Sequence, residues 1–262
     1  MNLNLEGKTA LVCGSTQGLG YASAVELALL GAHVILVARN EEKLKEAVNT
    51  LDRSKDQRHE YLVADFSDTG SVQKAIDSYI NAGKMAHILV NNTGGPAGGT
   101  ALAAKTTEFI EAFNNHLICN HILTQALVPG MKAAGFGRII NIISTSVKQP
   151  IVGLGVSNTI RAAVANWAKT LATELGPFGI TVNNVLPGFT KTVRADYVIK
   201  KKMADSGKTE EEVMKALVAE IPAGRIGQPE EFGAAVAFLC SPAAAYINGI
   251  NLPVDGGRLG CL

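Results

Sequence analysis

The sequence predicts a doubly wound α/β fold, in which a seven-stranded parallel sheet has helices on both faces. Seven short runs of β-branched and aliphatic residues recur along the chain, and helical segments of 10–25 residues separate them. The runs are apolar almost throughout instead of alternating with polar residues, which is typical of strands buried on both faces of a parallel sheet. No linker and no internal repeat divides the 262 residues, so we expect a single domain over residues 1–262.

The expected strands are five or six residues long, and they are TALVC (9–13), HVILVA (33–38), YLVAD (61–65), HILVN (87–91), RIINII (138–143), ITVNNV (180–185) and INLPV (250–254). One stretch between the last two strands, residues 190–220, breaks the regular alternation. It contains three consecutive lysines and then Thr209-Glu210-Glu211-Glu212, a capping sequence before a short amphipathic helix. We expect a mobile insertion there that serves as a lid over a substrate.

A glycine-rich loop follows the first expected strand directly and leads into a helical Ala/Leu segment. A dinucleotide pyrophosphate needs bare backbone for close approach and the free N–H groups of a helix start, and this arrangement supplies both. An ordinary tight turn is the alternative, but the position at the first βα turn favours a Rossmann-like cofactor site. The loop residues that we assign to this site are Gly14, Ser15, Thr16, Gln17, Gly18, Leu19 and Gly20.

The end of the second expected strand indicates which dinucleotide binds. Arg39 lies 19 residues after Gly20, near the place where an acidic residue would bind the ribose 2′-hydroxyl of NAD. An arginine can instead pair with the 2′-phosphate of NADP in a charge-assisted contact. A solvated surface arginine is the alternative. We therefore expect NADP as the cofactor in preference to NAD.

The composition argues against several other classes of protein. The 24 Lys+Arg and 23 Asp+Glu give a net charge of +1, so the chain lacks the basic surface of a nucleic-acid binder. Its longest nearly uninterrupted apolar stretch, residues 27–38, is shorter than the roughly 18 residues that a membrane helix needs. The amino terminus has no secretory pattern, so we expect a cytoplasmic protein. The four cysteines lack metal-ligand spacing, so we expect no metal site and interpret them as packing residues.

Beyond the glycine loop, short motifs occur in a set order along the chain. They are Asp65-Phe66 after the third expected strand, Asn91-Asn92-Thr93-Gly94 after the fourth, Gly137-Arg138-Ile139-Ile140-Asn141-Ile142-Ile143-Ser144 along the fifth, Pro187-Gly188-Phe189-Thr190-Lys191-Thr192 after the sixth, then Pro222-Ala223-Gly224-Arg225 and Val254-Asp255-Gly256-Gly257. Together they resemble the short-chain dehydrogenases/reductases, and most closely the 3-oxoacyl-(acyl-carrier-protein) reductase-like branch. The resemblance covers essentially the whole chain.

The resemblance implies a role for each motif in holding the cofactor. The residues that it assigns are Asp65 toward the adenine, Asn91 and Gly94 around the adenosine ribose, and Pro187, Gly188 and Thr192 at the nicotinamide. We also expect Phe66, Thr93 and Thr190 to bind the cofactor. Each has an ordinary alternative, such as a helix cap for Asp65, a strand-end turn for Asn91 and a simple loop for Pro187-Gly188. The family also implies a homo-oligomer, either a homotetramer or a dimer.

The catalytic pattern of that family is only partly present. In the family a serine polarises the substrate carbonyl, a tyrosine about 13 residues later donates the proton, and a lysine one helical turn beyond lowers the tyrosine pKa and binds the nicotinamide ribose. Ser144 matches the serine, but the tyrosine and lysine positions hold Ser157 and Arg161. The asparagine of the family's proton relay is replaced by His116.

These replacements change which group can donate a proton. A serine hydroxyl is a far weaker acid than a tyrosine phenol, so Ser157 cannot simply inherit that role. Arg161 can donate hydrogen bonds to ribose hydroxyls or to an oxyanion, but it stays protonated. His116 has an ordinary pKa of about 6.5, which suits acid–base work near neutrality, and the alternative is a helix histidine in the core. The pattern Tyr197-x3-Lys201 lies beyond the sixth strand, and we interpret it as a coincidence on a solvated helix.

We therefore expect an NADP-dependent enzyme that transfers hydride between nicotinamide and a carbonyl or alcohol substrate, a 3-oxoacyl thioester being one candidate. Its catalytic residues would be Ser144, Ser157, Arg161 and His116, with the proton coming from water, from His116 or from either serine hydroxyl. The alternative is a catalytically degenerate NADP(H)-binding protein that acts as a sensor or partner subunit. Epoxide or halohydrin chemistry, found in relatives with arginine for lysine, fits less well because those relatives keep the tyrosine and lose the glycine loop.

Overall fold

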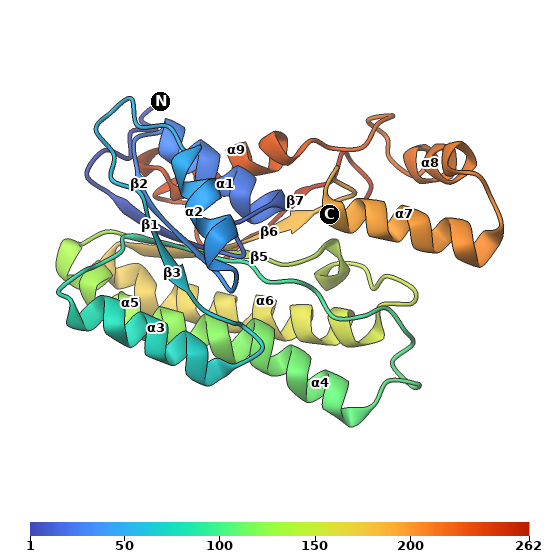
Figure 1. The fold of residues 1–262 in the computed structure, drawn as a ribbon, viewed down its shortest axis with the longest axis horizontal. Helices are drawn as coiled ribbons and strands as arrows, with labels where there is room; N and C mark the ends of the chain where they lie inside the picture. Colours follow the sequence, from blue (N-terminus) through green and yellow to red (C-terminus); the bar gives the residue numbers. More distant parts are fainter. Residues whose placement is uncertain (262) are drawn as a thin grey trace.

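Seven parallel strands form the central sheet in the order β3-β2-β1-β4-β5-β6-β7 (Figure 1). The computed structural model describes residues 1–261. The strands are β1 Thr9–Cys13, β2 His33–Ala38, β3 Glu60–Val63, β4 Ile88–Asn91, β5 Gly137–Ile142, β6 Ile180–Pro187 and β7 Asn251–Val254. Each predicted strand is present, and its bounds differ from the expected ones by at most two residues at either end. The predicted fold class is confirmed.

Helices cover both faces of this sheet (Figure 1). One layer holds α1 Gly18–Leu29, α2 Glu41–Asn49 and α9 Pro229–Cys240. The opposite layer holds α3 Thr69–Asn81, α4 Thr106–Phe113, α5 Cys119–Ala134 and α6 Gly155–Leu175. A π-helical turn, Asn114–Ile118, joins α4 to α5. The central strands are thereby shielded from water on both faces, which explains why most of their residues are apolar.

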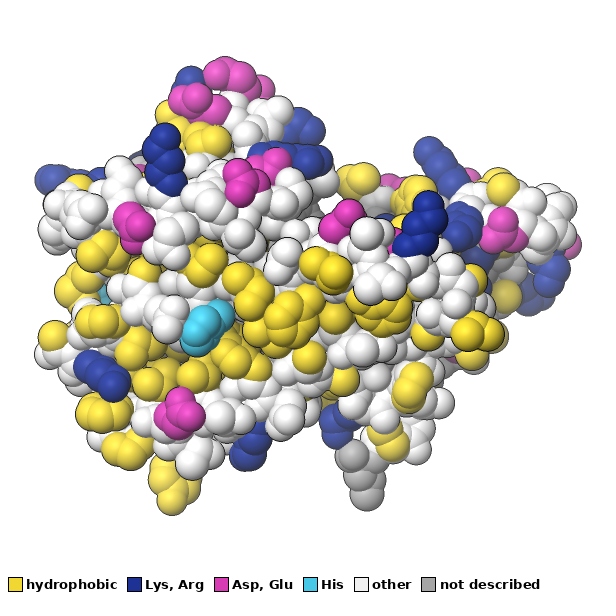
Figure 2. Space-filling model, turned by 90° about the horizontal axis from the view of Figure 1, so that it is seen from below, with side chains coloured by type: hydrophobic (Ala, Val, Ile, Leu, Met, Phe, Trp, Pro, Cys, Tyr) yellow, Lys and Arg dark blue, Asp and Glu magenta, His cyan; other side chains and the backbone are white. Residues whose placement is uncertain are grey.

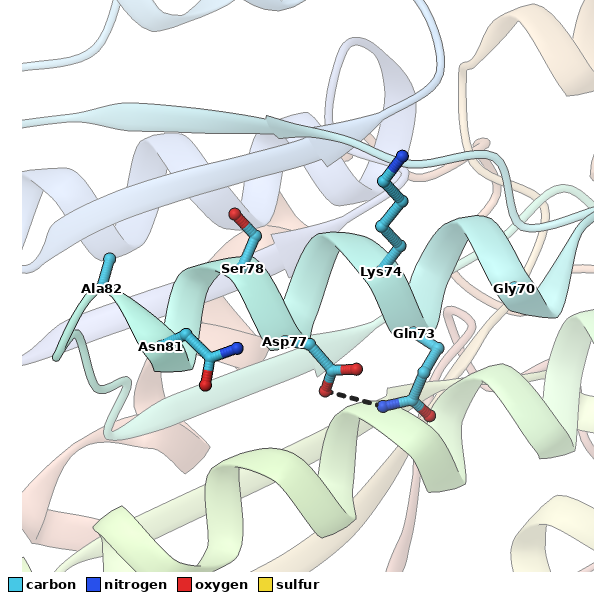
Figure 3. A pocket seen from close by; sticks show the side chains of 7 residues that line it. All are labelled: Gly70, Gln73, Lys74, Asp77, Ser78, Asn81 and Ala82. Carbon is cyan, nitrogen blue, oxygen red and sulfur yellow. Dashed lines mark hydrogen bonds between the residues drawn. The ribbon is translucent and has the colours of Figure 1, made fainter.

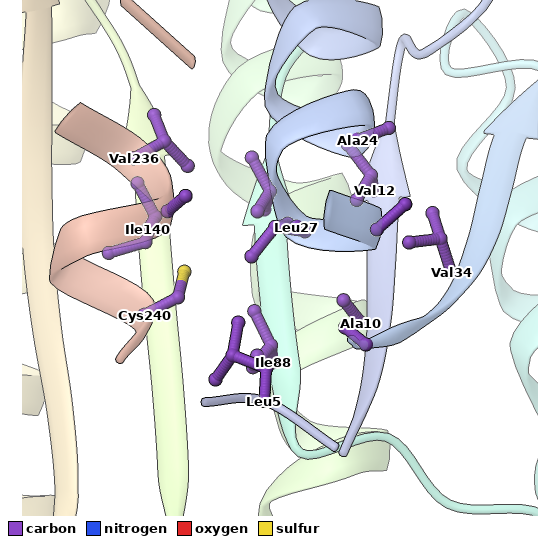
Figure 4. Packing of buried hydrophobic residues seen from close by; sticks show 14 of the residues in the cluster. Leu5, Ala10, Val12, Ala24, Leu27, Val34, Ile88, Ile140, Val236 and Cys240 are labelled. Atoms are coloured by element: carbon purple, nitrogen blue, oxygen red, sulfur yellow. The ribbon is translucent and has the colours of Figure 1, made fainter. Parts of the chain in front are cut away.

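The apolar core packs in two layers, one on each face of the sheet. On the face of α1, the fully buried Val12 and Val34 of the sheet belong to the same cluster as Leu27 (Figure 4). Gly233 of α9 lets that helix approach α1 closely, because a Cβ there would lie 2.7 Å from the carbonyl oxygen of Ala22. Burial of each such aliphatic side chain contributes about 1.5–3 kcal/mol. This packing holds the sheet as a rigid platform for the loops at its edge.

Asparagine side chains link four adjacent strands near the carboxyl edge of the sheet. Asn91 of β4 donates to Asn141 of β5 at 2.9 Å, and Asn141 donates to Asn184 of β6 at 3.0 Å. Asn184 in turn donates to Asn251 of β7 at 2.8 Å. The four residues are paired across the strands in register. This asparagine ladder satisfies buried amides and penalises any slip of one strand past the next.

The stretch 190–220 folds beside the sheet as two helices, α7 Val193–Ser206 and α8 Glu210–Ala219 (Figure 1). The predicted helix after Thr209 is confirmed as α8. Its capping box is complete, because the Thr209 hydroxyl accepts from the Glu212 N–H and the Glu212 carboxylate accepts from the Thr209 N–H. The three lysines lie on α7, in agreement with the solvated helix expected around Tyr197 and Lys201. The two helices lie next to the carboxyl edge of the sheet, as a lid would.

The cysteines confirm the sequence interpretation only in part. Cys13, Cys119 and Cys240 are buried, as packing residues should be, but Cys261 is exposed. The expectation that all four pack in the interior is therefore wrong for the last one, which lies in the C-terminal tail. Among the described helices, none is both long and apolar enough to span a membrane.

We predict that the asparagine ladder stabilises the fold measurably. Asn141→Ala leaves the Asn91 amide and the Asn184 carbonyl oxygen without partners in a buried setting, and each orphaned group costs about 1–3 kcal/mol. The free energy of unfolding should fall by about 2–5 kcal/mol, measured by urea denaturation at fixed protein concentration. The control is Asn166→Ala on the exposed face of α6, which should change it by less than about 0.5 kcal/mol. Equal effects of the two substitutions would contradict this role of the ladder.

Candidate active site

The predicted site residues gather where the strand order reverses. The loops after β1, β4, β5 and β6 all leave the carboxyl edge of the sheet, and β1 lies between β2 and β4. Chain segments that leave neighbouring parallel strands in opposite directions open a crevice at this point. The glycine loop and the three later motifs therefore share one edge, as the motif order predicted.

Two of the loop glycines adopt backbone conformations that residues with a side chain rarely adopt. Gly14 and Gly18 have positive φ angles, +56° and +61°. A Cβ on Gly14 would lie 2.7 Å from the carbonyl oxygen of Asn92, and one on Gly20 would collide with the carbonyl oxygen of Gly14. Asn92 also donates through Nδ2 to the Gly14 carbonyl oxygen at 3.1 Å. The loop is thus compact and bare, and it is fastened to the end of β4.

The start of α1 offers unpaired donors to this loop. The helix begins at Gly18, and the preceding Gln17 makes no side-chain cap. The first N–H groups of a helix have no partner within the helix, and together with its dipole they attract an anion. Ser15 contributes main chain only, because its hydroxyl donates to the Val12 carbonyl oxygen and accepts from the Val37 N–H. These features fit the pyrophosphate of a dinucleotide.

Arg39 and Asp65 lie within electrostatic reach of each other at the ends of β2 and β3. The pKa of Asp65 is lowered mainly by hydrogen bonds from the Ser67 N–H and hydroxyl, and also by the charge of Arg39. Asp65 is not the cap of α3, since Asp68 holds that position by accepting from the Gly70 N–H. Arg39 is exposed and takes part in no ion pair among residues 1–261. Its guanidinium is free for an anionic group.

In the loop after β4, some side chains hold the fold together and others lie at the candidate site. The Asn91 side chain is buried in the asparagine ladder, so only its main chain can face a ligand. The Thr93 hydroxyl lies 2.5 Å from Nδ1 of His116. Gly94 and Gly95 are exposed, and the guanidinium of Arg161 approaches Gly95, with Nη2 3.7 Å from the position of a Cβ there. This loop is where the β4 end, the π-helical turn and α6 meet.

The pKa of His116 is lower than the value of about 6.5 that made it a candidate acid or base near neutrality. The residue lies in the π-helical turn and is 2% exposed. Burial, with a contribution from the charge of Arg161, lowers its pKa to about 2. The ring is therefore neutral near pH 7, and that part of the expectation is wrong. A neutral imidazole still carries one N–H and one lone pair, so with Thr93 it can pass a proton from one nitrogen to the other.

Ser144, Ser157 and Arg161 occupy the end of β5 and the first half of α6. The Ser144 hydroxyl accepts from the Ser146 N–H at 3.1 Å and so caps the short helix that follows β5. Ser157 is half-buried one turn before Arg161 on α6. Arg161 donates through Nη1 to the Ile142 carbonyl oxygen at 3.1 Å. Burial lowers its pKa to about 10, with a contribution from Arg194, so it remains a cation at neutral pH.

The motif after β6 meets the glycine loop. The Gly188 N–H donates to the Val254 carbonyl oxygen at 2.9 Å, which fixes the turn after Pro187 against β7. Thr190 is buried, and Thr192 caps α7 by accepting from the Ala195 N–H. A methyl carbon of Thr192 lies 3.8 Å from the position of a Cβ on Gly18. Two motifs about 170 residues apart in the sequence are thus neighbours, as the family resemblance implied.

Helix α7 adds two cations, Arg194 and Lys201, that the sequence interpretation did not assign to the site. Arg194 donates through Nη2 to the Pro96 carbonyl oxygen at 3.4 Å, and its guanidinium stacks on the ring of Tyr197. Tyr197 is 55% exposed. Nζ of Lys201 lies 3.7 Å from the position of a Cβ on Gly98. From the sequence, the one indication that Arg194 lies near the site is that it follows Thr192 by two residues.

Other candidate sites receive no support. A groove along one face of α3 is lined by residues of that helix and its C-terminal cap, and its Gln73 and Asp77 pair with each other at 2.8 Å (Figure 3). It includes no predicted site residue. In the described part of the chain, no three His, Cys, Asp or Glu side chains are grouped as metal ligands.

Comparisons with known proteins agree with this arrangement. A model of the family described as "Enoyl-(Acyl carrier protein) reductase" matches residues 14–258. The 3-oxoacyl-[acyl-carrier-protein] reductase FabG of Vibrio cholerae is 34% identical over 256 residues, which are 97% of this chain and 98% of that protein. L-sorbose reductase from Gluconobacter frateurii, solved with NADPH and L-sorbose, superposes with a TM-score of 0.93 at 33% identity over 100% of both chains. YwfH, an NADPH-dependent reductase involved in bacilysin biosynthesis, superposes with a TM-score of 0.91 at 27% identity over 97% of this chain and 99% of YwfH.

We predict that His116 makes the fold sensitive to acid. Its pKa is lower in the folded than in the unfolded chain, so its contribution is complete above the unfolded pKa of about 6.5 and is lost as the pH falls below it. From pH 7.5 to pH 4.5 this residue alone should cost about 2–3 kcal/mol of unfolding free energy. His116→Asn removes that cost, while all other titrating groups stay the same. Urea denaturation of both proteins at both pH values measures the difference, and parallel losses would contradict the prediction.

Proposed function

The chain belongs to the short-chain dehydrogenases/reductases, and from that membership we propose that it is an NADPH-dependent reductase of a small carbonyl compound, with a proton donor other than tyrosine. It is an NADP-dependent oxidoreductase by family. One observation carries the proposal: the bare glycine loop, the uncapped start of α1 and Thr192 meet at the crevice of the sheet. This arrangement supports binding of the dinucleotide, which hydride transfer requires.

The preference for NADPH over NADH rests on Arg39. Its free guanidinium stands at the end of β2, where the adenosine ribose is bound in folds of this type. A 2′-phosphate offers it a charge-assisted and bidentate partner, whereas a 2′-hydroxyl does not. The relatives solved with NADPH, among them L-sorbose reductase, support the same choice.

The chain's own residues would each perform one part of the reaction. The bound nicotinamide would supply or accept the hydride. We assign Ser144 to hold the carbonyl oxygen of the substrate, and Arg161 to donate to ribose hydroxyls and to the charge that develops on that oxygen. The proton would come from water, from neutral His116 through Thr93, or from a hydroxyl at 144 or 157. Arg161 itself would not be the proton donor, because with a pKa of about 10 it keeps its proton at neutral pH.

A broad apolar face supports assembly of several copies. Figure 2 shows apolar side chains gathered over the face that the layer of α4, α5 and α6 forms. Ile110 and Phe113 of α4 are 55% and 39% exposed there. Large apolar surfaces of this kind mark interfaces between proteins. We propose a homo-oligomer, a tetramer or a dimer, of a cytoplasmic enzyme with a small-molecule substrate and no nucleic-acid partner.

A second candidate function is favoured by the loss of the tyrosine and lysine. Ser157 and Arg161 cannot reproduce the phenol and amine chemistry of the family. A protein that binds NADP(H) without turnover, as a sensor or a partner subunit, would keep the cofactor crevice and could lose that pair. Activity measurements separate the two candidates.

We predict that Arg39→Gln weakens NADPH binding about 10–100-fold and leaves NADH binding unchanged, because only NADPH loses a charged partner. Isothermal titration calorimetry with each nucleotide measures both affinities. The matched control is Arg58→Gln, an exposed arginine just before β3, which should change neither affinity by more than about twofold. Equal losses of NADPH and NADH affinity in Arg39→Gln would overturn the role of the 2′-phosphate contact.

We predict that the protein oxidises NADPH anaerobically with at least one member of a panel of ketones, oxo acids and 3-oxoacyl thioesters. The loss of nicotinamide absorbance measures turnover. The variant that combines Ser157→Tyr with Arg161→Lys restores the family pattern and serves as the comparison. Activity in the parent comparable to that of the variant supports the reductase. Activity in the variant alone, with tight NADPH binding in both, identifies the parent as a binding protein.

A further inference from the structure

Arg161 is a buried cation without a counter-ion. It is 8% exposed, and within residues 1–261 its only hydrogen-bond acceptor is the Ile142 carbonyl oxygen. Arg138 shows how the fold treats a buried arginine that has a structural role: it donates to two carbonyl oxygens and stacks on the ring of Phe136. A guanidinium has five N–H donors, and burial of an unpaired charge is costly. Most donors of Arg161 are left for something that the chain does not supply.

Two further cations lie on the same loop. Nη2 of Arg161 lies 3.7 Å from the position of a Cβ on Gly95, and Nζ of Lys201 lies 3.7 Å from the position of a Cβ on Gly98. Between them, Arg194 donates to the Pro96 carbonyl oxygen at 3.4 Å. None of the three takes part in an ion pair in the described part of the chain. The three cations border one loop without a paired carboxylate, and an anion bound among them would offset the repulsion between their charges.

The chain has also lost the group that could balance this charge. A tyrosine at position 157 could ionise beside a cation, whereas the serine hydroxyl of Ser157 stays neutral at any working pH. The anionic parts of a dinucleotide have their own partners, namely the start of α1 for the pyrophosphate and Arg39 for a 2′-phosphate. The nicotinamide end carries no negative charge. The missing anion therefore belongs to the substrate.

We infer that the substrate carries a carboxylate, which Arg161 binds from α6 while Arg194 and Lys201 cover it from α7. This inference rests on the proposed function and names its substrate class: an oxo acid, or in reverse a hydroxy acid, in place of a neutral thioester. A carboxylate suits a guanidinium because it accepts two parallel hydrogen bonds. In the reduction, the carbonyl carbon takes a hydride from the reduced nicotinamide and the carbonyl oxygen takes a proton. The products are a hydroxy acid and oxidised nicotinamide, and the carboxylate is unchanged.

Binding, measured apart from turnover, tests this site. The probes are laevulinate and its methyl ester, which differ only in the charge, titrated calorimetrically into NADP⁺-loaded protein in a phosphate-free, low-salt buffer. Laevulinate should bind at least about tenfold more tightly than the ester. Arg194→Gln should weaken laevulinate about tenfold and leave NADP⁺ affinity unchanged, because the Arg194 guanidinium contacts Pro96 and Tyr197, neither of which is assigned to the cofactor. Lys202→Gln, which removes one exposed charge from the same helix, should change laevulinate affinity less than twofold.

The outcomes separate this inference from the proposed function. Equal binding of laevulinate and its ester, no binding of either, or equal effects of the two lid substitutions would each overturn the carboxylate site. Inorganic phosphate that displaced laevulinate with higher affinity would overturn the choice of carboxylate over phosphate. Turnover of neutral ketones without laevulinate binding would leave the reductase standing and remove this site. Charge-dependent laevulinate binding without any turnover would support the carboxylate site and contradict the proposed reductase function.

Discussion

The register of the parallel sheet at its carboxyl edge is the constraint on which the site depends. Asn92 ties the end of β4 to the main chain of the glycine loop, and the asparagine ladder ties β4 through β5 and β6 to β7. The loops after β4, β5 and β6, which carry Thr93, Ser144 and Gly188, each leave their strand within a few residues of its asparagine. A shift of one strand by a single residue would turn its side chains to the other face and move its loop by about 3.3 Å. Buried amides that pair only in register oppose such a shift.

Local patterns were enough to predict the fold and the cofactor crevice. The apolar runs identified each strand because strands covered on both faces have no polar side to interrupt them. The glycine loop was recognisable because close approach of backbone and positive φ angles leave few alternatives at Gly14 and Gly18. Thr192 could be placed beside this loop only through the family resemblance, since no local property joins residues so far apart.

The remainder of the site depends on contacts that a sequence does not display. A histidine in an exposed helix has a pKa of about 6.5. The burial of His116, with a contribution from the charge of Arg161, lowers its pKa to about 2. The side chain of Asn91 belongs to the ladder because Asn141 lies opposite it, which requires the register of β4 and β5. Arg194 reaches the site only because α7 folds against the loop after β4. In each case the residue that determines the role lies on another helix or strand, so spacing along the chain does not indicate that role.

The two halves of the crevice differ in how they tolerate substitution. The cofactor half is built mainly from main-chain N–H groups, glycines and strand ends, so apart from the glycines and Arg39 its chemistry depends little on side chains. The catalytic half depends on side-chain charge, and there a tyrosine–lysine pair can form a neutral unit when the phenol ionises. Ser157 and Arg161 cannot form that unit, because one partner never ionises and the other never loses its proton near neutrality. The positive charge of Arg161 must therefore be balanced by the ligand and not by the protein. Substitution at two positions of one helix thus changes which substrates the same fold can bind.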